Sequence, residues 1–407
     1  MTTTSTLVIL YCVATAVAIA VRRLRVPYTV ALVIVGLAIG SLKLIAPPHL
    51  TKELLFTFFL PGLLFEAAFH LDLVAFGRVW RSAVALAVPG VVLVIAITAA
   101  VIVVAGRLLG MSAISGWRLG LVLGAIVAAT DPVAVTAVFR EVRVPARLAA
   151  LLEGESLLND GTGVVFFSLV VAYATGSESS VLGFGAKFLA VAGGGTLVGF
   201  CVGWIIALLI QRLNEPMIEI ALTMIAAYGS FVLAQSAGVS GVLATVVAGV
   251  LCGRHGRDRG MSEASRAATG SFWQYVAFAL NSIVFLLIGF EVNGKELLAV
   301  WPEIMTAFIA MLIARAVVVW ALLGVQHRSR DVIPGKWSIV LAWGGLRGAL
   351  CMVLALTVPV EMAQRDLLIA MTIGVVVLSI VLQGATMPML VRRLGLSERG
   401  EDPFATR

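Results

Sequence analysis

Charge is scarce in this sequence. Only 13% of its 407 residues are Asp, Glu, Lys or Arg, whereas soluble domains have about 25%. Hydrophobic residues make up 60%, and the mean hydropathy is +1.06. This balance excludes a soluble globular protein, and no stretch has the composition of a separate soluble domain. The net charge of +7 follows from basic loops, so it does not indicate a nucleic-acid partner.

Cysteine and long polar segments are also scarce. The four cysteines lie in or beside apolar runs, and no two of them have the spacing of metal ligands. We therefore expect neither a disulfide nor a cofactor. The sequence shows no nucleophile–base pair of the kind that would indicate an enzyme. The longest polar segment, 254–271, reads as an inside loop rich in Arg, Gly and Ser.

Long apolar runs are abundant. A membrane-spanning helix needs about 20 apolar residues, and strands of a barrel would instead alternate in polarity. The sequence predicts an all-α polytopic membrane protein with thirteen transmembrane helices, of which the third is interrupted by Pro61 and the ninth is short. The expected spans are 5–21, 28–46, 53–75, 82–105, 118–138, 148–175, 186–211, 216–235, 238–253, 272–292, 301–324, 337–358 and 366–391.

The basic residues predict the orientation of these spans. No positive charge precedes the first apolar run, and Arg22, Arg23 and Arg25 follow it, so we expect a span rather than a cleavable signal. With the N-terminus outside and the C-terminus inside, most lysines and arginines fall on the inside. Residues 1–393 would then form the transmembrane domain and 394–407 a short cytoplasmic tail. The odd count predicts one added helix and two inverted six-helix repeats.

Spans 5 and 12 contain matching breaks. Pro132 disfavours helix at Asp131, and the glycines of 344–348 interrupt span 12. Broken helices at corresponding positions of two repeats indicate a binding site where they cross. Asp131 would cap the second half of span 5, and the free carbonyls of 128–130 are candidate cation ligands. Capping a helix and contacting a cation are compatible roles for Asp131.

Span 6 places polar residues near the bilayer midplane. Glu155 and Asn159 share one helix face, and Ser156 and Asp160 share the adjoining face. A desolvated aspartate holds either a proton or a small monovalent cation. Asp160 is therefore the candidate carrier, with Asn159 as a neutral neighbour.

Two arginines also lie within spans. Arg315 and Arg347 stay charged, so each needs compensation, and the candidate acidic partners are Glu155, Glu66 and Asp131. We favour a structural ion pair between Glu155 and Arg315. Arg347 would offset the negative ends of the two half-helices.

Other titratable residues have weaker signals. Glu153 stands at the start of the span 6 motif, and Glu219 and Glu291 lie near span ends, where we expect them to be solvated. His70 and His255 are candidates for pH sensing, although a single histidine near a membrane surface is more often only solvated.

Four motifs resemble one transporter family. Leu-Pro-Gly-Leu-Leu-Phe-Glu at 60–66, Ala-Thr-Asp-Pro-Val-Ala-Val at 129–135, Glu-Ser-Leu-Leu-Asn-Asp-Gly at 155–161 and Trp-Gly-Gly-Leu-Arg-Gly-Ala at 343–349 are similar to those of NhaP-type sodium/proton antiporters. These belong to the monovalent cation/proton antiporters that include the animal Na+/H+ exchangers. The resemblance extends over the whole chain.

The resemblance implies a core domain and a dimerisation domain, a homodimer, and elevator-like alternating access. It implies that Asp160 carries the ion and the proton, and that Asn159 makes the exchange electroneutral. The implied ion site consists of Thr130, Asp131, Ser156, Asn159 and Asp160, with Na+ held by Asp160, Thr130 and Ser156. Glu155 and Arg315 correspond to the family's buried pair, and Arg347 to its motif arginine.

The expected function is antiport of Na+ (or Li+) for H+, for pH homeostasis and sodium transport, in a lipid bilayer that we expect to be a bacterial inner membrane. K+/H+ antiport is the nearest alternative. A cation channel, from a different class, would need a continuous polar stripe, whereas the polar residues here cluster at one depth. The tail is too short for the long cytoplasmic regulatory region of some relatives.

Overall fold

The computed structural model is predominantly helical over the described residues. The described residues are 3–24, 28–41, 55–131, 135–136, 139, 142, 144–176, 181–257, 260–290, 294–326, 333–362 and 364–396, and they include no strand. Seven of the described helices are long and apolar enough to cross a membrane. A described helix lies within each of the thirteen expected segments. The count of thirteen spans and the inverted repeats nevertheless remain predictions.

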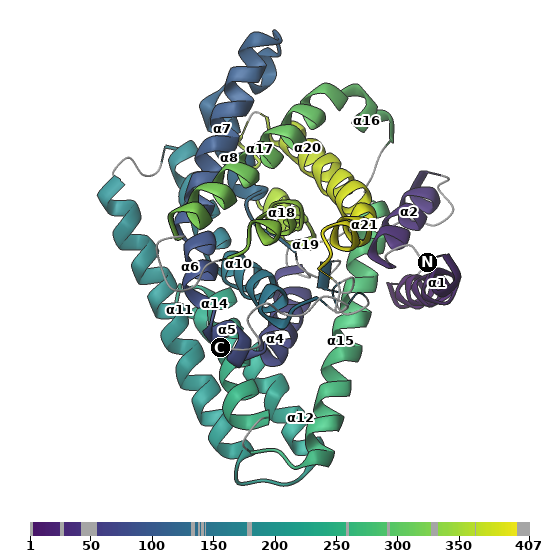
Figure 1. Cartoon of the computed structure of the whole chain (residues 1–407), viewed down its shortest axis with the longest axis vertical. Coiled ribbons are helices and arrows are strands. Elements are labelled where there is room, and N and C mark those ends of the chain that lie inside the picture. Colours follow the sequence, from purple (N-terminus) through teal and green to yellow (C-terminus); the bar gives the residue numbers. More distant parts are fainter. Residues whose placement is uncertain are drawn as a thin grey trace. The chain divides into compact units, whose positions relative to one another are not determined.

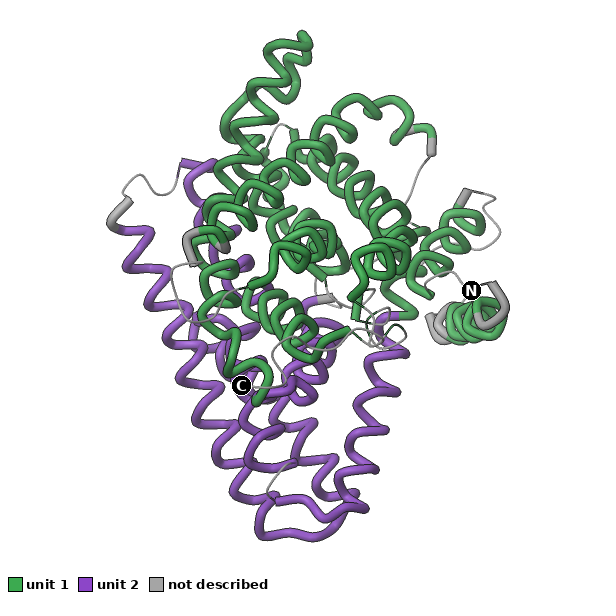
Figure 2. Tube along the Cα trace, viewed as in Figure 1, with its two compact units in different colours: residues 1–49, 74–159, 282–407 green, residues 50–73, 160–281 purple. Residues whose placement is uncertain are grey.

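The chain divides into two compact units (Figure 2). Unit 1 comprises Met1–His49, Val74–Asn159 and Ser282–Arg407, and unit 2 comprises Leu50–Leu73 and Asp160–Asn281. Two long helices contribute to both units, α10 (Ala146–Ala174) and α15 (Glu263–Phe290), and the short helix α5 (Leu73–Gly77) begins one residue before unit 1 resumes at Val74. The boundary within α10 falls between Asn159 and Asp160.

Unit 1 contains most of the described helices. Its central contacts are those of α7 with α8 and with α17, and those of α17 with α18 and α20. A buried cluster that includes Leu151, Leu341 and Met387 forms one part of its core. Besides its parts of α10 and α15, its helices are α1 (Thr3–Leu24), α2 (Tyr28–Ser41), α5 (Leu73–Gly77), α6 (Trp80–Ala87), α7 (Pro89–Leu108), α8 (Trp117–Ile126), α16 (Gly294–Ala299), α17 (Trp301–Gln326), α18 (Gly335–Trp343), α19 (Ala349–Leu356), α20 (Arg365–Leu378) and α21 (Ala385–Arg393).

Unit 2 is built around the contact of α11 with α14 (Figure 1). A Cβ at Gly199 of α11 would collide with the backbone of Ala244 on α14, so glycine allows the two backbones to approach closely. Phe65, Phe69 and Trp273 form the aromatic part of the core. Besides its parts of α10 and α15, the helices are α4 (Leu60–His70), α11 (Val181–Ile210), α12 (Pro216–Met224), α13 (Ser230–Ser236) and α14 (Gly241–Leu251).

Two local features differ from the expectation or refine it. The segment 254–271 is not a loop throughout, because α15 already begins at Glu263. The Ser262 hydroxyl accepts a hydrogen bond from the Ser265 N–H at 3.2 Å, which is the contact of an N-terminal cap.

Pro61 does not break the third span in its middle. The π-helical turn at Leu55–Phe59 continues directly into α4, whose second residue is Pro61, so the helix runs through this proline.

Both expected helix breaks are present in the described residues. Helix α8 ends at Ile126, and 127–131 are not helical. Helix α18 ends at Trp343, and α19 begins at Ala349 after a non-helical segment. Pro132, the predicted first residue of the helix that Asp131 would cap, lies outside the described residues.

Candidate ion site

The two breaks meet within unit 1. The backbone N–H of Asp131 donates to the carbonyl of Leu346 at 2.8 Å. A Cβ at Gly348 would collide with the Asp131 carboxylate, so glycine is required for this approach. Two interrupted helices are thus joined where their backbones leave the helical hydrogen-bonding pattern.

Arg347 neutralises the end of α8. Its Nη1 donates to the carbonyls of Ala128 and Ala129 at 3.3 and 3.0 Å, and its backbone N–H donates to Ser379 Oγ at 3.0 Å. Carbonyls that follow a helix end carry its negative partial charge. The buried guanidinium therefore offsets the end of α8 as well as filling the second break.

Glu155 and Arg315 form a buried ion pair. Arg315 Nη1 and Nη2 donate to Glu155 Oε1 and Oε2 at 2.8 and 2.9 Å, and both side chains are buried. The guanidinium also donates to the Leu341 carbonyl at 3.3 Å. Two parallel hydrogen bonds fix the geometry as well as the charge.

Asn159 joins this pair to the first break. Its Nδ2 donates to the Ala128 carbonyl at 3.0 Å, to Glu155 Oε1 at 3.3 Å and to Thr130 Oγ1 at 3.4 Å. Thr130 Oγ1 and Ser156 Oγ share a hydrogen bond of 2.7 Å. The carbonyls of Ala128 and Ala129 already accept protein hydrogen bonds. The hydroxyls of Thr130 and Ser156 and the Asp131 carboxylate are therefore the better candidate cation ligands here.

Asp160 follows Asn159 directly on α10 and is half-buried. It stands one turn after Ser156 and so shares a face of the helix with it. Unit 1 brings together most of the predicted site residues: Thr130, Asp131, Glu155, Ser156, Asn159, Arg315 and Arg347. Asp160 is the next residue of α10 after Asn159.

Some contributors were not anticipated from the sequence. Cys351 Sγ donates to the Ala129 carbonyl at 3.4 Å, and Met311 Sδ lies 3.0 Å from Arg347 Nε. Ser379 and Gln383 hydrogen-bond to each other at 2.6 Å behind Arg347. Of these residues, only Ser379 and Gln383 could have been suspected from the sequence, because two polar residues four apart are unusual in an apolar span.

The weaker candidates fall outside this cluster. Glu66, in unit 2, pairs with His70, whose Nδ1 lies 3.3 Å from Glu66 Oε1. His255 is half-buried against the ring of Trp204. Glu291 lies outside the described residues.

The expectation that Glu219 is solvated is wrong. Its side chain is 0% exposed, because the first turns of α15, which the sequence analysis assigned to a loop, are helical and pack against it.

Comparison with known proteins identifies the family. The model of the sodium/hydrogen exchanger transmembrane domain matches residues 8–393. The Na+/H+ antiporter ApNhaP of Aphanothece halophytica is 39% identical over 91% of this chain and 70% of its own length. The chain belongs to the sodium/hydrogen exchanger family. The resemblance stated from the four motifs is therefore confirmed, and this exchanger is a multi-pass integral membrane protein.

Other exchangers support the same assignment. The Na+/H+ antiporter NhaH of Halobacillus dabanensis is 31% identical over 92% of this chain and 94% of its own. The fold is similar to that of the sodium proton antiporter MjNhaP1 from Methanocaldococcus jannaschii. The TM-score is 0.78, with 97% of this chain and 98% of that chain covered at 22% identity.

Proposed function

We propose that this chain exchanges Na+ (or Li+) for H+ across the membrane; its relatives are named Na+/H+ antiporters. The observation that supports this most is the polar cluster on α10, held against the crossing of two broken helices. It places hydroxyl and carboxylate oxygens beside a neutral amide and ends on an aspartate. Hard oxygen ligands of this kind suit a small alkali cation.

Asp160 is the proposed carrier. When ionised, it binds Na+ together with the hydroxyls of Thr130 and Ser156, and Asp131 completes the site. When it binds a proton, its attraction for the cation is lost. Competition between the two ions at one carboxyl group is sufficient for exchange under alternating access.

The stoichiometry we propose is one Na+ for one H+. Asn159 has no ionisable group, and Glu155 is neutralised by Arg315 at 2.8 Å. Asp160 is then the group whose charge changes during transport. Exchange should therefore be electroneutral and insensitive to membrane potential.

The remaining parts of the proposal concern the assembly. We propose that residues 1–393 form the antiporter domain of a homodimer, N-terminus outside and C-terminus inside, in a bacterial inner membrane. The short tail 394–407 would lie in the cytoplasm.

The purified protein in proteoliposomes tests this function. An inward Na+ or Li+ gradient should drive protons out, detected by a trapped pH dye, whereas K+ should not. Asp160→Asn should be inactive. Equal or greater proton movement with K+ would favour K+/H+ antiport. Cation flux that does not depend on a proton gradient, and moves no protons, would indicate a channel.

A further inference from the structure

Glu219 is a buried acid that the proposed transport cycle does not use. It lies in the first turn of α12 and has 0% of its side chain exposed. Neither of its carboxylate oxygens completes a hydrogen bond with any described residue. The Ser265 hydroxyl and the Glu215 backbone amide lie close enough to the carboxylate to stabilise its charge, but neither contact has the geometry of a hydrogen bond. The start of α12 offsets only part of a negative charge.

Two hydroxyl groups on α15 are also buried without a hydrogen-bond partner among the described residues. Ser265 and Thr269 are both 0% exposed, and the side-chain oxygen of each has no hydrogen-bond partner among the described residues. They stand one turn apart on the same face of α15. One turn further, Trp273 Nε1 donates to Thr223 Oγ1 on α12 at 3.0 Å. Thr269 therefore lies between two positions at which α15 contacts α12.

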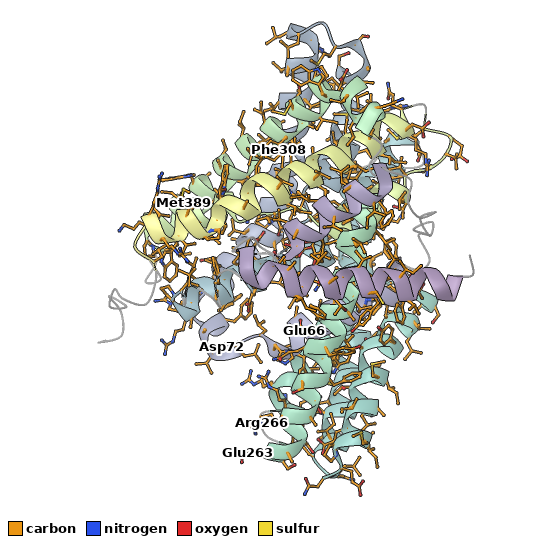
Figure 3. All side chains as sticks on the ribbon, turned by 90° about the vertical axis from the view of Figure 1, so that its right-hand side faces the viewer. Glu66, Asp72, Glu263, Arg266, Phe308 and Met389 are labelled. Carbon is orange, nitrogen blue, oxygen red and sulfur yellow. The ribbon has the colours of Figure 1, made fainter. Side chains whose placement is uncertain are left out.

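The charged residues at this end of α15 do not compensate Glu219. Arg266, next to Ser265, is exposed, as is Glu263. Both lie at the outer edge of the end of α15 (Figure 3). Within the described part of unit 2, no basic side chain forms an ion pair with Glu219. A buried carboxylate with neither a cation nor a full set of donors is strongly disfavoured in its ionised form.

We propose that Glu219, Ser265 and Thr269 form a second binding site for an alkali cation such as Na+, built from unit 2 alone, whose ion is retained rather than transported. One carboxylate neutralises one positive charge, which favours a monovalent over a divalent ion. Hydroxyl oxygens turn their lone pairs toward a cation and their hydrogens away from it. The ion would thus satisfy four buried oxygen atoms at once.

Equilibrium binding of radioactive sodium to the purified full-length protein tests the proposal. The wild type should bind two Na+ per chain, Glu219→Gln one, Asp160→Asn one, and the double variant none. Glu263→Gln removes an exposed acid from the same end of α15 and should still bind two. The two sites are counted separately, so a failure of the Asp160 assignment would leave the Glu219 result readable.

Sodium binding by Glu219→Gln equal to that of the wild type would overturn the proposal and would leave Glu219 as a buried neutral acid. Ser265→Ala in the Asp160→Asn background provides a second measurement that keeps the carboxylate, in case Glu219→Gln does not fold. Its Na+ affinity should be about tenfold weaker, the effect of removing one polar partner of a charge. An unchanged affinity would also contradict the proposal.

Discussion

At the scale of single residues, Asn159 determines how the candidate site holds its charges. Its amide nitrogen donates to a backbone carbonyl, a hydroxyl and a carboxylate oxygen. Donating to all three requires an amide, because a carboxylate has no hydrogen to give. The residue therefore keeps the Glu155–Arg315 pair and the first helix break together without adding charge beside Asp160.

Replacement of Asn159 by Asp tests this role. An ionised carboxylate at position 159 would face the Ala128 carbonyl and the Glu155 carboxylate, neither of which can donate to it. We therefore expect the new carboxyl group to be protonated over much of the working range and to titrate together with Asp160. The pH profile of exchange in proteoliposomes should shift relative to the wild type. If both carboxyl groups take part, exchange should also become sensitive to an imposed membrane potential. An unchanged profile together with insensitivity to voltage would mean that position 159 does not line the ion site.

The Glu155–Arg315 pair should contribute to stability through charge compensation. Glu155→Gln or Arg315→Gln leaves one buried charge alone, and each should lower the free energy of unfolding by about 3–5 kcal/mol. The double variant should recover part of that loss. Thermal melting in detergent measures the effect, with exposed Arg266→Gln as the control, for which we expect little change. Losses that simply add in the double variant would rule out direct coupling.

At the scale of elements, the crossing of the two breaks depends on close backbone approach. Gly348→Ala would drive a Cβ into the Asp131 carboxylate and should separate α19 from the first break. We expect exchange to fall by at least about tenfold, because displacement of a positioned group by about 1 Å commonly costs more than that. The matched control is Gly335→Ala at the start of α18, where a Cβ meets nothing within 4 Å. Wild-type exchange by Gly348→Ala would contradict the proposed role of the crossing.

The positions of the breaks were predictable, whereas their mutual contacts were only partly so. Pro132 and the glycines of 344–348 are local signals, since their effect on a helix does not depend on the rest of the fold. The pairing of Glu155 with Arg315 was favoured because buried charges need partners. The bond from Asp131 to Leu346 uses backbone atoms, which every residue has, and so left no signal in the sequence.

Glu219 shows the limit of sequence reasoning at this scale. A carboxylate near the end of an apolar run is ordinarily solvated, and the segment that covers it reads as polar loop. That segment becomes helix because Ser262 caps it, and its Ser265 and Thr269 face is buried. Burial by a neighbouring polar helix depends on tertiary packing, which hydropathy along the chain does not describe.

At the scale of the whole molecule, α10 is the helix on which the account depends. It contributes Glu155, Ser156 and Asn159 to unit 1 and begins its part of unit 2 at Asp160. The family's fold explains why so much polar chemistry is tolerated within an apolar chain. Within unit 1, Glu155 is paired with Arg315, and the carbonyls at the end of α8 are bonded by Arg347, Asn159 and Cys351.

The central claim is that Na+ and H+ compete for Asp160. The most direct measurement is the affinity of the purified protein for Na+ as a function of pH. To remove any contribution from the second site, the Glu219→Gln variant should be measured alongside the wild type. Because one Na+ displaces one H+, the apparent affinity in Glu219→Gln should weaken by about tenfold for each unit of falling pH at the acidic end of the range. The further change Asp160→Asn should abolish this binding. An affinity for Na+ that does not change with pH, or that survives in the Asp160→Asn variant, would contradict the account.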